Sequence, residues 1–148
     1  MTHQDFKRPE SVLVLVYTVN GQVLLMERQN PVGFWQSVTG SLEWHEQDPL
    51  QAAIRELQEE TGLTVTPRAT GLENLFPILP EWRERYHPEV TENREYVFAV
   101  ELDSPCKIQL NPDEHVRYEW LDLSGAIQRC SSWSNSQALE LVIKRTHC

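Results

Sequence analysis

The sequence predicts one α/β domain in which a mixed β-sheet lies between helices. Two observations carry this prediction. Short segments rich in β-branched and apolar residues recur between turn residues, as strands do, and two longer segments have apolar residues at helical spacing with capping residues at their ends. With 148 residues, the chain can bury a sizeable core as one domain, which we expect to span residues 1–148.

A β-hairpin is expected near the start of the chain. Residues 11–19 and 22–27 are apolar and β-branched, and the pair Asn20-Gly21 between them favours a two-residue hairpin turn. Residues 34–39 are expected to form a short third strand, which leads into the loop before the first helix.

The first helix has signals at both ends. Asp48 is a good N-cap, Pro49 suits the first helical position, and Gln51 has the spacing of a capping box. Gly62 can adopt the left-handed conformation that ends a helix. The side expected to lie on the core carries apolar residues at positions i, i+3, i+4 and i+7, namely Leu50, Ala53, Ile54 and Leu57.

The second half of the chain predicts further strands and one more helix. Residues 133–145 have helical spacing, with Ser132 or Ser134 as the N-cap. The buried stripe of this helix is expected to contain Leu139, Val142 and Ile143. The expected strands are residues 63–70, 95–102, 107–110 and 116–121, and residues 76–88 form a segment punctuated by prolines.

Carboxylates cluster on one side of the first helix. Glu56, Glu59 and Glu60 fall at i, i+3 and i+4, and such a group suits a hard divalent cation. An acidic helix can also present a solvated face, because like charges at this spacing cost only about 0.2–0.5 kcal/mol when exposed. The surrounding residues decide between these two interpretations.

The wider pattern resembles the signature of the Nudix hydrolases, which is a glycine, a glutamate and then Arg-Glu-Leu-x-Glu-Glu-x-Gly. Eight residues separate the first glutamate from the arginine, one more than is usual in that family, and His45 stands where a glycine is common. The resemblance implies an α/β/α sandwich and hydrolysis of a phosphoric anhydride. The matching residues are Gly40, Glu46, Arg55, Glu56, Glu59, Glu60 and Gly62.

The chemistry expected of this helix is hydrolysis of a pyrophosphate group assisted by a cation. Mg²⁺ binds few carboxylates and bridges phosphate oxygens, so Glu56 and Glu60 are candidate ligands, with Mn²⁺ as an alternative ion. Glu59 could bind a further metal or take a proton from the attacking water. Arg55 is expected to orient a glutamate rather than to contact the substrate.

Stretches outside the helix resemble a bacterial branch of the same family that hydrolyses dihydroneopterin triphosphate. That branch belongs to folate biosynthesis, is also described as acting on dATP, and releases pyrophosphate to leave the monophosphate. The matching stretches are residues 7–9, 34–43, 85–93, 114–115, 118–122 and 132–135.

This resemblance implies several further site residues. Glu114 matches a glutamate that reaches the metal from outside the helix, and Lys7 and Arg28 match basic positions suited to a triphosphate. Thr39 and Ser132 could bind substrate by hydrogen bonds, although a strand residue and a helix cap explain them equally well. An apolar run could form the wall of a ring pocket or simply pack in the core, and it consists of Phe76, Pro77, Ile78 and Leu79.

Composition limits the other possibilities. The chain has 13 lysines and arginines against 22 aspartates and glutamates, a net charge of −9, which argues against broad binding to nucleic acid or anionic membranes. Cys106, Cys130 and Cys148 are too few and too widely spaced for a disulfide framework or a zinc site. The first residues lack the apolar core of a signal peptide, so residence in the cytoplasm is expected. The oligomeric state is left open.

Competing functions stay open at this point. One is a Nudix hydrolase of another nucleoside triphosphate, a nucleotide sugar or a capped RNA end. Another is a non-catalytic Nudix-like ligand sensor. Such proteins typically lack glutamates of the signature, whereas Glu56, Glu59 and Glu60 are all present.

Overall fold

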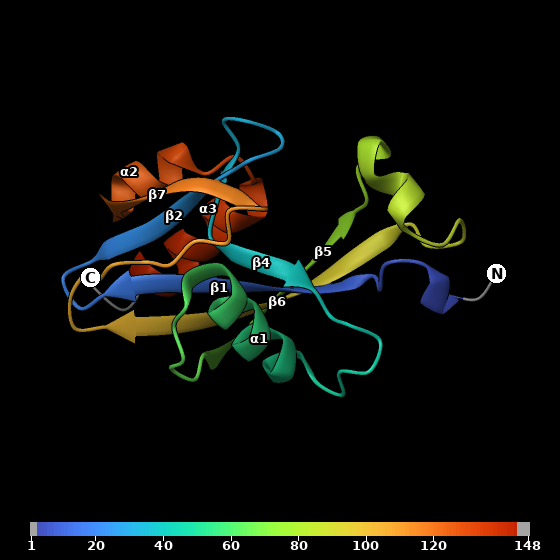
Figure 1. Ribbon diagram of the computed structural model, residues 1–148, viewed down its shortest axis with the longest axis horizontal. Coiled ribbons are helices and arrows are strands. Elements are labelled where there is room, and N and C mark those ends of the chain that lie inside the picture. Colours follow the sequence, from blue (N-terminus) through green and yellow to red (C-terminus); the bar gives the residue numbers. More distant parts are fainter. Residues whose placement is uncertain (1–2, 145–148) are drawn as a thin grey trace.

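The computed structural model describes residues 3–144, which form a mixed sheet with helices on both faces (Figure 1). Strands β1 (Glu10–Thr18) and β6 (Glu92–Leu102) run parallel, and the other strand pairs are antiparallel. The predicted mixed sheet and α/β class are therefore confirmed. The remaining strands are β2 (Gln22–Arg28), β3 (Trp35–Gln36), β4 (Val38–Ser41), β5 (Arg68–Pro77) and β7 (His115–Asp122).

Two cores lie on opposite faces of the sheet. Alternate residues of β1 point to opposite sides, so Val12 and Val14 pack under α1 (Pro49–Thr61), whereas Leu13 and Leu15 pack under the C-terminal helices. Those helices are α2 (Leu123–Arg129), α3 (Trp133–Leu139) and the π-helical turn η3 (Glu140–Lys144). The arrangement is the expected α/β/α sandwich (Figure 1). None of the helices in the described part of the chain is long and apolar enough to cross a membrane.

The edge of β1 that faces away from β6 is shared by two strands. β6 pairs with β1 from Glu10 to Thr18, so β4 and β2 must use the other edge, β4 near the start of β1 and β2 near its end. β2 then continues away from β1 with β3 and β7 as its partners. The free edge of β4 therefore faces the β2–β3–β7 ribbon, and the candidate site lies there.

Several expected strand boundaries were wrong. Residues 34–39 form two short strands instead of one, and the strand expected at 63–70 begins only at Arg68 and continues to Pro77 along β6. Residues 107–110 are not a strand, because their backbone bonds elsewhere: Ile108 N–H donates to the Tyr118 hydroxyl, and Gln109 N–H to the Thr61 carbonyl. The short helices η1 (His3–Asp5) and η2 (Pro80–Arg85) complete the fold.

The helix ends agree with the sequence prediction better than the helix faces do. Asp48 accepts a hydrogen bond from Gln51 N–H, Pro49 begins α1, and Gly62 ends it with a φ of 79°. The Gln51 side chain accepts from Gln47 N–H, one residue earlier than in a standard capping box. The helix expected at residues 133–145 begins after Ser132, as α3. Of its expected buried stripe, Leu139 and Ile143 are fully buried and Val142 is partly buried. Position 145 lies outside the described residues. Helix α2 was not predicted.

The core-facing side of α1 differs from the prediction in a way that matters for the site. Ala53 and Leu57 are fully buried as expected, but Leu50 and Ile54 are 37% and 39% exposed. The buried stripe instead continues through Glu56 and Glu60, at i+3 and i+7 from Ala53. The helix is thus rotated so that two carboxylates, not two aliphatic side chains, lie against the sheet.

Candidate active site

The Glu56 carboxylate lies directly against the backbone of β4. A methyl group added at Gly40 would come within 2.2 Å of the Glu56 Cδ atom, so only glycine leaves room for this carboxylate. Arg55 Nη1 donates to Glu56 Oε1 at 2.6 Å. Burial raises the pKa of Glu56, although hydrogen bonds and the charge of Arg55 partly oppose that effect.

Glu60 is the most deeply buried carboxylate of the helix. It is 1% exposed, and neither carboxylate oxygen has a hydrogen-bond partner within the described structure. Burial raises its pKa well above the usual value, the neighbouring Glu56 carboxylate and the charge of Glu114 act in the same direction, and the Thr39 backbone N–H opposes the rise without cancelling it. An unpartnered buried carboxylate is costly, and a bound cation would remove the cost.

His115 faces Glu60 from the start of β7. Its Nδ1 atom lies 3.7 Å from Glu60 Oε1 and has no hydrogen-bond partner, while its Nε2 atom lies 3.1 Å from the amide nitrogen of Gln36. Burial, together with the charge of Arg28, lowers the pKa of His115 to about 4, so the imidazole is neutral at pH 7.

Glu60, Glu114 and His115 together form a candidate metal centre. Their ligand atoms lie within 4.8 Å of one another. Two buried oxygens and a buried ring nitrogen without partners, beside the exposed Glu114, fit the donor set of a divalent cation. Sequence reasoning selected Glu60 and Glu114 as metal ligands but not His115, although residues 114–115 form one of the stretches that resemble the bacterial branch.

Arg55 joins four glutamates in one network, of which Glu43 is the most distant at 3.8 Å. Its Nε and Nη2 atoms donate to the two oxygens of Glu46, at 3.0 and 2.9 Å, while Nη1 contacts Glu56 and lies 3.4 Å from Glu59. Burial lowers the pKa of Arg55, but the Glu46 hydrogen bonds and the charge of Glu56 outweigh it, so the pKa is raised overall. The loop with one residue more than usual therefore still brings Glu46 to Arg55.

Glu59 differs from the other helix glutamates in exposure. Its side chain is 51% exposed, whereas those of Glu56 and Glu60 are 10% and 1% exposed. Glu59 therefore lies at the surface of the carboxylate cluster, where water and a substrate can reach it.

Two predicted basic residues lie beside the carboxylates. Lys7 stands over the Tyr86 ring, 5.9 Å from its centre. Burial of its ammonium group lowers the pKa of Lys7, as do the charges of Arg85 and Arg28, while Glu56 and Glu114 raise it. Arg28 Nε donates to the Asn30 carbonyl at 2.9 Å, and its charge acts on both Lys7 and His115. Positive charge is thus concentrated next to the carboxylates, as an anionic phosphate chain requires.

The other predicted substrate residues have structural partners. The Thr39 hydroxyl donates to the Val12 carbonyl at 2.9 Å, and Ser132 caps α3 and contacts the Ser134 hydroxyl at 2.9 Å. In the apolar run, Phe76 packs edge to face with Trp133 with 6.5 Å between ring centres. Ile78 is 8% exposed, and Pro77 and Leu79 are exposed, so the four residues do not form one continuous wall.

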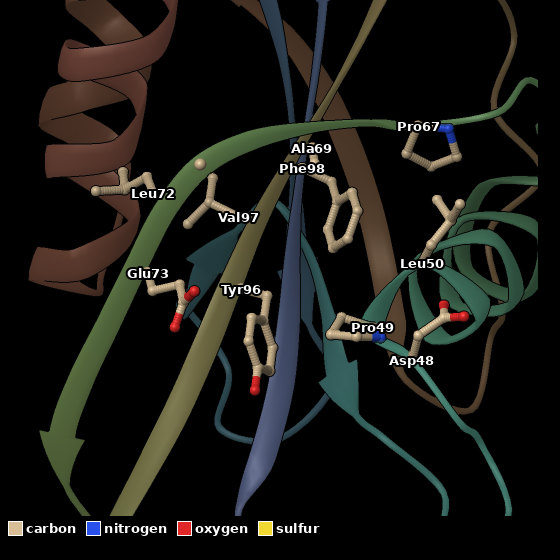
Figure 2. Close-up of a pocket in the computed structure, with 11 residues that line it drawn as sticks. Asp48, Pro49, Leu50, Pro67, Ala69, Leu72, Glu73, Tyr96, Val97 and Phe98 are labelled. Atoms are coloured by element: carbon tan, nitrogen blue, oxygen red, sulfur yellow. The ribbon is translucent and has the colours of Figure 1, made fainter.

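A separate cavity of about 380 Å³ lies between the start of α1 and strands β5 and β6 (Figure 2). Leu50, Tyr96 and Phe98 contribute much of its apolar lining, and Leu50 is one of the side chains expected in the core. No residue selected for the site from the sequence lines this cavity. The carboxylate cluster is therefore a distinct feature.

Comparisons with known proteins give matches over most of the chain. The NUDIX domain family matches residues 7–140. The dihydroneopterin triphosphate diphosphatase of Escherichia coli (strain K12) is 40% identical, covering 95% of each chain, and that of Haemophilus influenzae is 35% identical, covering 92% of this chain and 88% of its own. The structure of the E. coli dihydroneopterin triphosphate pyrophosphohydrolase superposes with a TM-score of 0.87, at 38% identity, covering 95% of this chain and 98% of the other.

Proposed function

This chain belongs to the Nudix hydrolase family, and we propose that it converts dihydroneopterin triphosphate to dihydroneopterin monophosphate and pyrophosphate. The observation that carries the proposal is the 40% identity, over 95% of both chains, to a relative named for hydrolysis of this substrate. The reaction would serve folate biosynthesis, and dATP is a second candidate substrate. We further propose that residues 1–148 act as one Nudix domain, and residence in the cytoplasm stays a prediction.

Nudix hydrolases generally use divalent metal cations, and we assign Mg²⁺ to this chain, with Mn²⁺ as an alternative. Glu56, Glu60 and Glu114 would hold the ion, and His115 lies beside them. Support comes from the orphaned oxygens of Glu60 and from the space that Gly40 leaves for Glu56. When bound, the cation neutralises phosphate charge and makes water a better nucleophile.

The protein's own side chains would perform the remaining tasks. Lys7 and Arg28 would bind the triphosphate oxygens, because they supply positive charge beside the carboxylates. Arg55 would hold Glu46 and Glu56 in place through its hydrogen bonds. Glu59 would accept the proton of the attacking water, because it is the exposed glutamate of the cluster.

Replacing Glu59 by glutamine should lower kcat by about 10²- to 10³-fold, because the amide cannot accept the proton. Stability should change little, since the side chain is half exposed. Steady-state kinetics and thermal unfolding would measure both effects, with Glu81→Gln at an exposed position as the control. Full activity of Glu59→Gln would reject its role as the base.

Replacing Arg55 by lysine should lower kcat about 10- to 100-fold and raise the metal concentration needed for half-maximal activity. Lysine supplies charge but cannot donate to both oxygens of Glu46 while also reaching Glu56. The matched control is Arg94→Lys, which makes the same exchange in one exposed pair with Glu73. Equal activity and metal dependence in the two variants would contradict the positioning role.

The substrate itself is best tested with a panel. Purified protein, incubated with Mg²⁺ and either dihydroneopterin triphosphate, dATP or another nucleoside triphosphate, should release pyrophosphate fastest from the pterin. The phosphorus product should be pyrophosphate and not orthophosphate. If a different nucleotide derivative were hydrolysed fastest, the chain would still act as a Nudix hydrolase, but the proposed substrate would be wrong.

A further inference from the structure

A group of buried polar side chains lies on the sheet face opposite α1. Asn93 and Glu95 are two residues apart on β6 and so point to the same side, and Asn74 of β5 is paired with Glu95. The three residues are 3%, 5% and 9% exposed, respectively. Further along the same stripe, Val97 and Ala99 belong to the apolar core under α3. Polar side chains that are buried this deeply require a structural or functional explanation.

The Glu95 carboxylate has no cationic partner in residues 3–144. Its Oε1 atom accepts from the Asn74 amide at 3.2 Å, and no lysine or arginine of that part pairs with it. Burial raises the pKa of Glu95, while the Asn74 amide and the Ser134 hydroxyl oppose the rise. A buried carboxylate held only by neutral groups can accept further donors.

Asn93 provides a second acceptor on the same strand. Its amide nitrogen donates to the Ser11 hydroxyl at 2.8 Å, but its Oδ1 atom is buried without a hydrogen-bond partner. A buried unpaired acceptor costs about 1–3 kcal/mol. Glu95 and Asn93 together thus present acceptors to a molecule that brings N–H donors.

This polar group is connected to the candidate active site. Ser11 is paired with Glu95 on one side and with Ser41 of β4 on the other, next to the Gly40 that accommodates Glu56. Asn135, which follows Ser134, exchanges two hydrogen bonds with Ser37, at 2.8 and 3.0 Å. The carboxylates of α1 and the polar group therefore lie on opposite faces of the sheet, with β1 and β4 between them.

We propose that Glu95 and Asn93 bind the N–H edge of the substrate's ring, and so favour a 2-amino-4-oxopyrimidine over adenine. This inference rests on the proposed function, because it names the ring specificity of the same site. Such an edge carries a ring N–H beside an amino group, so both donors match the two oxygens of one carboxylate, and Asn93 Oδ1 takes the remaining amino hydrogen. Adenine offers an amino group beside a ring acceptor, and that acceptor would face the carboxylate without a proton between them.

Replacing Glu95 by glutamine tests the inference while preserving side-chain shape. KM for dihydroneopterin triphosphate should rise at least about tenfold, because the glutamine amide presents a donor to a donor. KM for dATP should change less than about threefold, so the preference for the pterin falls. Glu73→Gln, an exposed position on β5, is the matched control, and thermal unfolding would verify that all variants fold.

A binding measurement separates the inference from the proposed reaction. Dihydroneopterin monophosphate can be titrated by its fluorescence, and Glu95→Gln and Asn93→Ala should each bind it more weakly than the parent and Glu73→Gln do. Equal binding by all four proteins, or an equal loss of kcat/KM for both substrates, would overturn the inference. If the parent protein binds the monophosphate through Glu95 but does not hydrolyse the triphosphate, the proposed function fails and the inference stands.

Discussion

Replacing Glu60 by glutamine should nearly abolish metal-dependent hydrolysis and stabilise the metal-free protein. The activity loss should be on the order of 10²- to 10³-fold, because the buried carboxylate is a proposed ligand of the cation. The gain in the free energy of unfolding should be about 1–3 kcal/mol at neutral pH, since neutral glutamine avoids the cost of burying or protonating a carboxylate without a hydrogen-bond partner. A carboxylate that served the fold alone would lose stability when replaced, so the opposite directions of the two effects distinguish a functional carboxylate from a structural one.

The pH dependence of stability gives the same residue a second readout. Burial raises the pKa of Glu60 above its ordinary value of 4.5, so the folded protein keeps a proton that the unfolded chain has lost. The stabilising contribution is therefore complete below the unfolded pKa and is lost as the pH rises through the folded pKa. In metal-free buffer the parent protein should lose stability over this window, and Glu60→Gln should lose less.

Urea unfolding with a chelator at several pH values would measure this difference. Glu59→Gln is the control, because its exposed carboxylate should leave the pH profile of stability unchanged. If Glu60→Gln were less stable than the parent protein at neutral pH without metal, the carboxylate would have a structural partner and the proposed cost of its burial would be wrong.

Local signals predicted where α1 begins and ends, but not which side of it is buried. Asp48, Pro49 and Gly62 act through hydrogen bonds and dihedral angles within a few residues, so the sequence is sufficient for them. The buried side depends on contacts with β4, where the Glu56 carboxylate occupies the space left by Gly40. Glutamate is usually exposed and leucine is usually buried, but in this helix Glu60 is buried and Leu50 is exposed.

Residues that meet through strand pairing were harder to predict. His115 contacts Gln36 because β3 and β7 both pair with β2, although the two residues are 79 positions apart. Glu95 reaches Asn74 only through the pairing of β5 with β6, and seven of the ten residues of β5 lie outside the strand expected at residues 63–70. A periodic pattern predicts that a strand exists, but its neighbour and register come from the whole sheet.

Replacing Gly40 by alanine should damage activity while leaving the fold nearly as stable. The new methyl group would lie 2.2 Å from Glu56 Cδ, so the carboxylate must move, and a displaced ligand of about 1 Å can lower kcat/KM by about 100-fold. The free energy of unfolding should change by less than about 1 kcal/mol, because the clashing atoms are the end of a flexible side chain. Kinetics, metal titration and chemical denaturation would measure these effects.

Gly71→Ala should show the opposite pattern and is the matched control for Gly40→Ala. Gly71 has a φ of 82° and no atom within 4 Å of the added methyl group, so alanine there would be strained without touching a neighbour. We expect a loss of about 1–2 kcal/mol in the free energy of unfolding, with kcat/KM and metal affinity unchanged. If Gly40→Ala instead lost stability and kept its activity, Gly40 would serve the fold alone, and the position of Glu56 against β4 would have no part in catalysis.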